Sequence, residues 1–93
     1  MIATQTKEKI LNVIQPYGPK MVGVFGSFAR GEQKPESDID IVVEFEEDLS
    51  LLDIIGIEQK LSEELGLNVD LMTKKSIHSR LKPYIEKDLI RID

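Results

Sequence analysis

Three aspartates stand where their carboxylates could act together. Asp38 and Asp40 are separated by one residue in the stretch SDIDIVVEF, and Asp70 lies in the later stretch NVDLM. In an extended chain, residues i and i+2 project to the same side, with Cα atoms roughly 6.5 Å apart. Carboxylates this close repel each other unless a cation joins them, and an all-oxygen ligand set favours a hard divalent ion, Mg²⁺ or Mn²⁺. The pair therefore predicts a metal site, to which Asp70 would supply a third ligand.

A Gly-Ser step precedes the aspartates, in the stretch VFGSFARGE. Mg²⁺ usually completes its coordination with substrate phosphate oxygens, so the carboxylates imply a substrate that carries phosphate. Glycine at position 26 lets a phosphate approach the backbone closely, and the N–H groups and hydroxyl that follow, at Ser27, would donate to it. Arg30 has two alternatives, because its guanidinium either reaches the same phosphates or pairs with a carboxylate and holds the loop.

The pattern of apolar residues indicates the elements that position this Gly-Ser step. Helical spacing over residues 4–15 predicts a first helix, which the turn PYGP over residues 16–19 ends. The β-branched run over residues 21–25 predicts a buried strand, and residues 27–30 predict one or two helical turns that end at Gly31. The Gly-Ser step therefore lies between a strand and a short helix.

Two further strands position the aspartates. Alternation over residues 39–45 predicts a strand with one apolar face, and Asp38 and Asp40 belong to its opposite face. The same alternation over residues 67–72 puts Asp70 on the corresponding face of a third strand. We therefore expect the three carboxylates on a sheet face that is partly open.

An amphipathic helix with clear ends is predicted between these two strands. Ser50 and Asp53 have the spacing of a capping box, and Gly66 marks the C-terminal end. The apolar stripe of this helix is expected to comprise Leu51, Ile54, Ile55, Leu61 and Leu65.

A last helix is expected to extend to about Lys87, with Thr73 or Ser76 as its cap and Pro83 either kinking it or starting a second piece. Residues 89–92 can add a short edge strand. Because helices alternate with strands, we predict an α/β (α+β) two-layer sandwich, in which a small mixed β-sheet has helices packed on one face.

Length and composition limit the class of protein. The 93 residues are expected to form a single domain, 1–93. With 17 acidic and 12 basic side chains and a net charge of -5, we expect no direct nucleic-acid binding and no attachment to an anionic membrane. Because the chain has no cysteine and no apolar run near the roughly 20 residues that span a bilayer, a cytoplasmic location is the simplest expectation.

The order of these motifs resembles the signature of the polymerase-beta-like nucleotidyltransferase superfamily. The matching residues are GS at 26–27, RG at 30–31 and SDID at 37–40, followed by an apolar strand. Asp70 stands where that superfamily has its third carboxylate. The short length resembles the minimal nucleotidyltransferase (MNT) proteins, which are commonly paired, as antitoxins, with HEPN-domain ribonuclease toxins.

The resemblance implies transfer of AMP from ATP to a hydroxyl, with release of pyrophosphate, and in the closest group the acceptor is a tyrosine of the HEPN toxin. It implies that Asp38 and Asp40 bridge two Mg²⁺ ions and that Asp70 ligates the second of them. It assigns nucleotide binding to residues of the GS, RG and SDID motifs, namely Gly26, Ser27, Arg30 and Ser37. HEPN toxin and ATP are thus the expected partners.

Two alternatives remain open for the function. The same chemistry can serve a small-molecule or another protein acceptor, or the chain can be a non-catalytic antitoxin that silences its partner by binding. Two surface features also remain open. The basic residues Lys74, Lys75, Arg80 and Lys82 form either a patch that steers ATP or a partner, or ordinary solvated surface. Tyr17 and Tyr84 can contact a nucleobase or a partner, but we interpret them as packing residues at the ends of elements.

Overall fold

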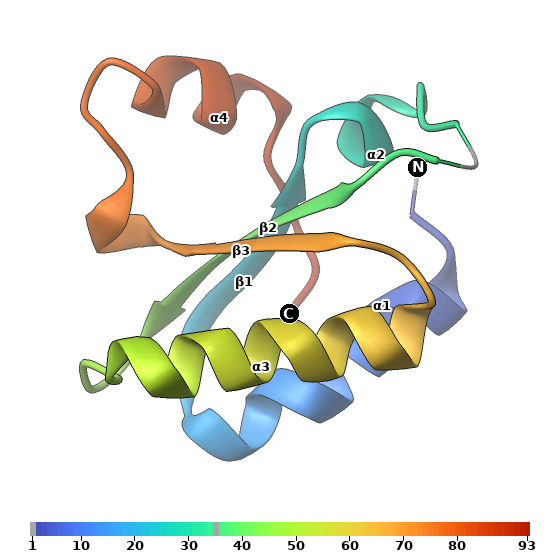
Figure 1. The fold of residues 1–93 in the computed structure, drawn as a ribbon. Coiled ribbons are helices and arrows are strands. Elements are labelled where there is room, and N and C mark those ends of the chain that lie inside the picture. The colour runs from blue at the N-terminus through green and yellow to red at the C-terminus, as the bar shows by residue number, and fades with distance from the viewer. Residues whose placement is uncertain (1, 35) are drawn as a thin grey trace.

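The computed structural model describes residues 2–34 and 36–93 (Figure 1). Helices and strands alternate along the chain much as the apolar pattern predicts. Their bounds, with η for 3-10 helices, are α1 (Thr4–Ile14), η1 (Gln15–Tyr17), β1 (Pro19–Phe25), α2 (Ser27–Arg30), β2 (Ile39–Phe45), α3 (Leu51–Leu65), β3 (Val69–Thr73), η2 (Lys74–Ser76), α4 (Lys82–Asp88) and β4 (Ile90–Arg91).

The four strands form one mixed sheet in the order β3-β2-β1-β4. β1 is antiparallel to both β2 and β4, whereas β2 and β3 are parallel. Parallel neighbours need a crossover connection, and α3 provides it between β2 and β3. The predicted small mixed sheet is confirmed.

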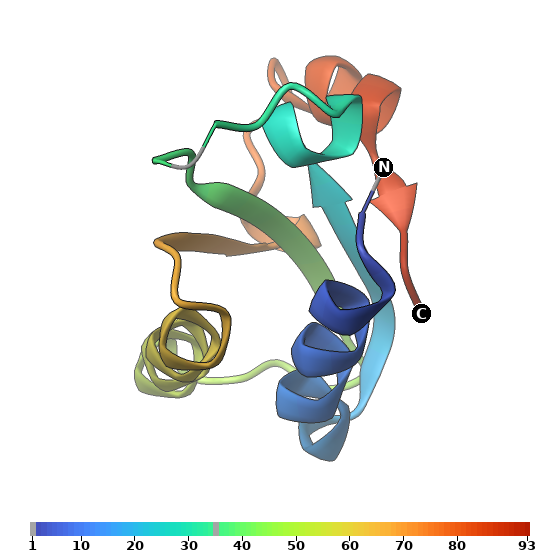
Figure 2. The ribbon, with the colours of Figure 1, turned by 90° about the vertical axis from the view of Figure 1, so that its right-hand side faces the viewer.

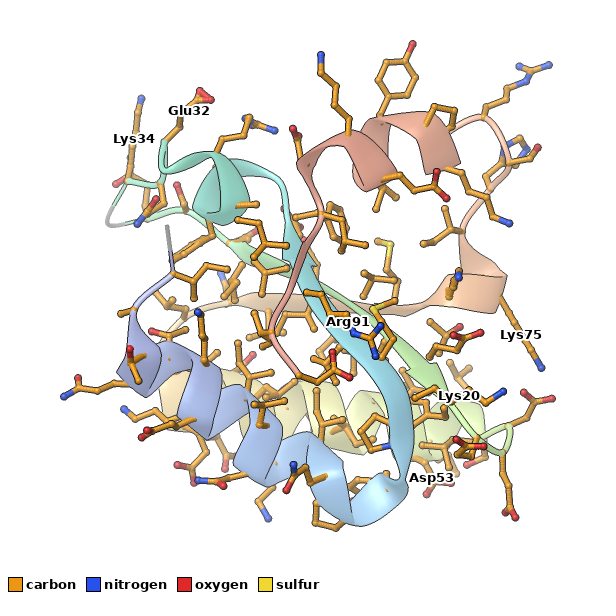
Figure 3. The ribbon with its side chains drawn as sticks, turned by 180° about the vertical axis from the view of Figure 1, so that it is seen from behind. Lys20, Glu32, Lys34, Asp53, Lys75 and Arg91 are labelled. Carbon is orange, nitrogen blue, oxygen red and sulfur yellow. The ribbon has the colours of Figure 1, made fainter. Side chains whose placement is uncertain are left out.

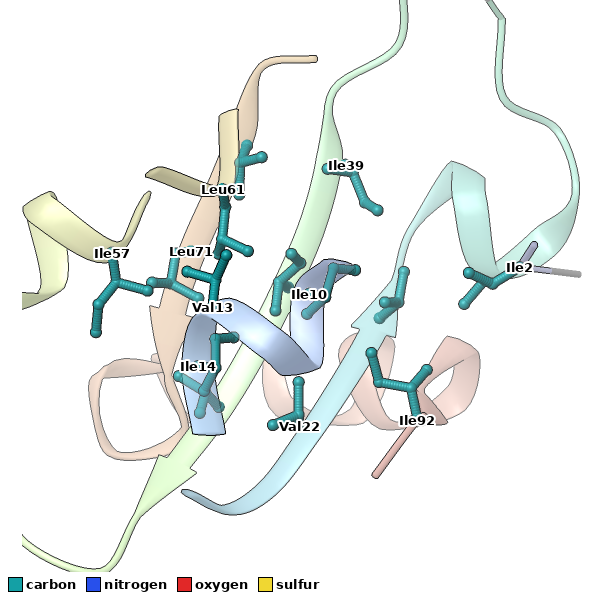
Figure 4. Close-up of a cluster of buried hydrophobic side chains, with 14 of the residues drawn as sticks. Ile2, Ile10, Val13, Ile14, Val22, Ile39, Ile57, Leu61, Leu71 and Ile92 are labelled. Atoms are coloured by element: carbon teal, nitrogen blue, oxygen red, sulfur yellow. The ribbon is translucent and has the colours of Figure 1, made fainter. Parts of the chain in front are cut away.

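The two long helices, α1 and α3, pack on the same face of the sheet (Figure 2). The core between them and the sheet is aliphatic, and Ile10, Val22, Ile39 and Leu61 are among its fully buried side chains (Figure 4). Alternate residues of β2 supply the centre of this core, as the alternation predicts. Burial of this face is the main stabilising term for the domain.

The opposite face of the sheet is covered in part by α4, which the expectation of helices on one face did not include. Ile85 of α4 packs with Phe25 and Val42 in a second, smaller apolar cluster, and Met72 and Leu89 border it. The middle of this face is therefore covered, and the end that carries the aspartates lies beyond this apolar cluster.

Both predicted ends of α3 are confirmed, but its predicted apolar stripe is wrong in part. The Ser50 Oγ accepts from the Asp53 N–H, the Asp53 carboxylate accepts from the Ser50 N–H, and the helix ends at Gly66. Leu51 is 74% exposed and Ile55 is 40% exposed.

The buried side of α3 instead comprises Ile54, Ile57, Leu61 and Leu65, which follow the three- and four-residue spacing of one helical face. Ile55 fails to reach the core because it lies about 100° around the helix from Ile54. The sequence prediction missed Ile57, which is fully buried.

One polar side chain of α3 reaches the edge of the sheet. The Glu58 carboxylate accepts a hydrogen bond of 2.9 Å from the Leu71 N–H of β3, and this contact is partly buried. β3 is an outer strand, so a side chain here satisfies a backbone donor that no neighbouring strand pairs.

At the C-terminal end, Pro83 begins a second helical piece, which is one of the two predicted alternatives. Ser76 closes the short η2 by donating to the Thr73 carbonyl, and α4 starts at Lys82 with Pro83 in its first turn. The predicted edge strand is confirmed as β4, paired with Gly23 and Val24 of β1. Tyr84 is 73% exposed, so its interpretation as a packing residue is wrong.

No helix among residues 2–34 and 36–93 is long and apolar enough to cross a membrane.

The corrected stripe of α3 predicts a large difference between two leucines of one helix. Leu61→Ala should lower the free energy of unfolding by about 2 to 5 kcal/mol, because Leu61 is completely buried and the cavity does not fully collapse. Leu52→Ala, at a side chain that is 80% exposed, should change it by less than about 0.5 kcal/mol. Urea unfolding monitored by circular dichroism measures both, and equal losses would contradict the burial described here.

Candidate active site

The parallel pairing of β2 with β3 brings two of the three aspartates together. Asp40 lies directly opposite Asp70 in the ladder, and Asp38 lies two residues before Asp40, just ahead of β2. Asp40 is half-buried, whereas Asp38 and Asp70 are exposed to solvent. The three carboxylates therefore gather at one end of the sheet, on the face that the alternation predicts.

Burial and the neighbouring negative charges change the acidity of Asp40. Burial is the largest cause and the charge of Asp70 the next, followed by a side-chain hydrogen bond with Asp70 and the charge of Asp38; together they raise the pKa of Asp40 to about 6. The positive charge of Arg30 acts in the opposite direction. At neutral pH the ionised Asp40 is thus held in an unfavourable environment that a cation would relieve.

Gly26 brings the backbone against this carboxylate. Its φ of 75° and ψ of -151° belong to a region that residues with a side chain rarely adopt. A Cβ at this position would overlap the Asp40 carboxylate oxygen Oδ2. The chain after β1 therefore passes so close to Asp40 that only glycine fits, and Ser27 follows at the first position of α2.

Arg30 pairs with carboxylates in this structure, which is the second of its two predicted alternatives. Its Nη1 donates to Asp88 over 2.6 Å and its Nε donates to Glu32 over 2.8 Å. Asp88 ends α4, so the guanidinium joins the loop after β1 to the helix that covers the same sheet face. A nucleotide-binding role for Arg30 remains a prediction.

Ser37 closes a local turn ahead of the aspartates. Its hydroxyl oxygen accepts from the Lys34 N–H over 2.7 Å, and its own N–H donates to the Lys34 carbonyl over 2.9 Å. This contact fixes the backbone just before Asp38. The predicted contact of Ser37 with a nucleotide is likewise not tested by the structure.

The donor set fits a hard divalent cation, although the side chains are not yet arranged around one. All three groups are carboxylates, and Mg²⁺ and Mn²⁺ prefer oxygen ligands. Within residues 2–34 and 36–93, no three acidic, histidine or cysteine side chains already surround a common metal position. The three side chains would therefore have to rearrange to share an ion.

Asp38 and Asp70 are exposed, and none of the three carboxylates lines the three hollows that the structure describes, although Ser37 and Asn68 line one of 470 Å³ beside them. One hollow of 290 Å³ lies at the opposite ends of β2 and β3, beside Phe45 and Thr73. Another, of 210 Å³, lies between α4 and the sheet, beside Val42 and Ile85. A substrate at the carboxylates would therefore keep one side exposed unless another molecule covered it.

The model of the family described as nucleotidyltransferase domain matches residues 7–92, which include every aspartate and glycine of the site. The chain belongs to this family. The nucleotidyltransferase identified from the motifs, and the enzyme class that the motifs imply, are confirmed.

Two relatives are similar along most of this nucleotidyltransferase. A protein of Methanocaldococcus jannaschii, named for a predicted protein adenylyltransferase activity, is 44% identical over 92 residues, which cover 99% of each chain. The protein adenylyltransferase MntA of Thermococcus cleftensis is 43% identical over 76 residues, which cover 82% of this chain and 77% of the relative.

A solved structure has the same fold. It is the crystal structure of a toxin-antitoxin with AMP-PNP, which matches with a TM-score of 0.86 and 26% identity over 94% of this chain and 72% of the other. The expectation of a minimal nucleotidyltransferase fold is therefore confirmed.

Asp88 is the site residue that the sequence prediction missed. It lies 58 residues from its partner Arg30, and neither a motif nor a helical spacing links the two. The sequence left two alternatives for Arg30 and did not identify an acidic partner. Asp88 reaches Arg30 only because α4 folds over the sheet.

The raised pKa of Asp40 predicts a stability that depends on pH. The folded-state value of about 6 exceeds the value near 3.9 of an unfolded chain, so ionised Asp40 destabilises the fold above about pH 6 and has no effect below about pH 4. Asp40→Asn should therefore raise the free energy of unfolding by about 1 kcal/mol at pH 7.5, a value reduced by solvent screening, and should not raise it at pH 3.5. Urea titrations in EDTA test this. A loss of stability at pH 7.5 would contradict it.

The position of Gly26 predicts an unequal pair of glycine substitutions. Gly26→Ala and Gly18→Ala both place a side chain at a positive φ, of 75° and 71°, but only the first Cβ meets another residue, Asp40. Gly18→Ala should cost about 1 to 2 kcal/mol of unfolding free energy, and Gly26→Ala should cost more, because strain and collision add. Denaturant unfolding of the two variants compares them, and equal costs would show that Asp40 moves aside freely.

Proposed function

We propose that this nucleotidyltransferase transfers AMP from ATP to a tyrosine hydroxyl of a HEPN-domain ribonuclease toxin, with Mg²⁺ as cofactor, and thereby acts as its antitoxin. The observation that supports this most is the pairing of Asp40 with Asp70 beside Gly26, since it unites the carboxylates with the backbone expected to hold phosphate. The protein adenylyltransferase names of the relatives and the AMP-PNP of the toxin-antitoxin structure add support.

The three carboxylates would bind metal ions, and Asp70 would also accept a proton. Asp38, Asp40 and Asp70 would hold two Mg²⁺ ions, which supply charge neutralisation for the triphosphate and a lower pKa for the acceptor hydroxyl. Asp70 is exposed on the outer strand, where an acceptor hydroxyl can approach and give up its proton. The hydroxyl oxygen forms a bond to the α-phosphorus as the bond to the leaving pyrophosphate breaks.

The loop after β1 would position the triphosphate. Gly26 offers backbone without a side chain, and Ser27 offers a hydroxyl for the β- and γ-phosphates. Arg30 already lies near enough to Asp40 to influence its acidity, so its guanidinium can reach phosphate if it leaves Glu32 or Asp88. Ser37 would act mainly by fixing the chain before Asp38.

The open surface supports a protein acceptor over a small molecule. Enzymes usually enclose a small substrate in a cleft, whereas Asp38 and Asp70 are exposed to solvent here. A macromolecular acceptor would itself cover the site and exclude water.

The proposal predicts a gain of mass on the partner. Incubation with a candidate HEPN-domain protein from the same genome, ATP and Mg²⁺ should add one or more AMP masses to that protein in intact-mass spectrometry, and EDTA should abolish the gain. Asp38→Asn with Asp40→Asn should abolish AMP transfer while the complex still forms. Glu44→Gln, on the same strand face as Asp40 but at its far end, is the matched control and should retain transfer.

The outcomes separate the proposed function from its alternatives. Good binding without any gain of mass would support a non-catalytic antitoxin or a different acceptor. Protection from the toxin by the double variant, at the level of the unaltered protein, would rule out neutralisation by catalysis.

A further inference from the structure

The charge of this acidic chain is not evenly distributed. Residues 74–87 carry five basic side chains and one acidic side chain, a net charge of +4, whereas the whole chain has a net charge of -5. These residues form η2, the connection to α4 and most of α4. Lys75 of η2, labelled at the right of Figure 3, pairs with the Asp48 carboxylate over 2.8 Å, so the unpaired basic charge is expected nearer to α4. A basic surface on an acidic protein attracts an acidic ligand or partner surface.

Two large apolar side chains stand exposed within this basic segment. Leu81 is 53% exposed and Tyr84 is 73% exposed, and Arg80, Lys82 and Lys87 are exposed around them. An apolar centre with a charged rim is the usual anatomy of a protein–protein interface, and tyrosine and arginine are its most frequent anchors. Binding of a polyanion alone would need the basic residues but would give no use to an exposed leucine.

The helix that carries this surface lies on the same sheet face as the carboxylates. Ile85, next to Tyr84, packs on Val42, which lies two residues beyond Asp40 on the same strand face. The other end of α4 is fixed beside the loop after β1 by the contact of Asp88 with Arg30. A protein that docks on Leu81 and Tyr84 and extends along α4 past Asp88 would therefore reach the end of the sheet where the acceptor hydroxyl must arrive.

We propose that Leu81 and Tyr84, with the basic rim of Arg80, Lys82 and Lys87, form the surface on which the acceptor protein docks, through an apolar face with an acidic rim. This inference rests on the proposed function, since it names how the acceptor of that site is held. The α4 surface fixes the partner, and the carboxylates act on the hydroxyl that the partner then presents.

A second exposed apolar surface provides an internal control. Leu51, Leu52 and Ile55 are exposed at the start of α3. Asp53 marks this end near the bottom of Figure 3, whereas α4 lies at the top. The acidic residues Glu46, Glu47 and Asp48 precede it, so its electrostatic character is opposite to that of the α4 surface.

The first test compares truncations on the two surfaces. Binding to the candidate HEPN-domain protein is measured by isothermal titration calorimetry for Tyr84→Ala, Leu81→Ser and, as the matched control, Leu52→Ser. We expect Kd to rise at least about tenfold for Tyr84→Ala and Leu81→Ser, and to change less than about twofold for Leu52→Ser. Because all three side chains are largely exposed, thermal unfolding should confirm that each variant folds.

The second test addresses the charged rim. Arg80→Glu with Lys82→Glu should weaken the complex about tenfold or more in 0.1 M salt, and the difference from the unaltered protein should shrink in 0.5 M salt. In AMP transfer, the same variant should raise KM for the partner and leave kcat at saturating partner within about twofold. A lower kcat with unchanged KM would place these residues in catalysis and overturn the docking role.

The remaining outcomes are each decisive. Loss of binding with Leu52→Ser but not with Tyr84→Ala would move the interface to α3, and absence of any complex with the unaltered protein would also overturn the proposal. Unchanged partner binding by the rim variant, with loss of affinity for a 20-nucleotide RNA, would show a polyanion site instead. A complex that depends on Tyr84 but transfers no AMP would support the docking surface and refute the proposed catalytic function.

Discussion

In the pairing of β2 with β3, Asp40 lies directly opposite Asp70. This contact is unfavourable, and the arrangement of the site depends on it. Like charges directly opposite each other destabilise a sheet, and the positive charge of Arg30 offsets this repulsion only in part, since the pKa of Asp40 stays raised. The register is held from the other side, where Ile39 and Ile41 are completely buried under α1 and α3. A slip of one residue would turn this apolar face to solvent, so core packing forces the carboxylates to stay together.

The parts of the fold that depend on local signals were predictable from the sequence. The alternation in β2 fixed both its limits and the face of its aspartates, because period-two alternation leaves one choice of buried side. The capping box at Ser50 and the glycine at 66 defined α3 for similar reasons, since caps are formed by residues close in sequence. Only the phase of its stripe was wrong, because Leu51 and Ile55 have the right residue type at the wrong angle.

The features that depend on contacts between distant residues were not predictable. The sequence indicated that Asp70 would share a face with Asp40, but the direct pairing of the two follows from the parallel crossover. Arg30 contacts Asp88, and α4 packs on Val42 through Ile85; both contacts join segments far apart in the chain. The composition of the chain leaves many acidic residues as equally possible partners of Arg30. Tyr84 was misjudged because helical position alone does not reveal which turn of a short helix faces the sheet.

The hydrogen bond from Leu71 to Glu58 has a consequence for how the protein can associate. An outer strand such as β3 ordinarily offers unpaired N–H groups to any extended segment that approaches, which is a common start of aggregation. Glu58 occupies one of these donors and adds a negative charge at the edge. Addition of a foreign strand is thereby disfavoured next to Asp70, so the edge that carries this carboxylate can remain exposed to solvent without becoming a template for fibrils.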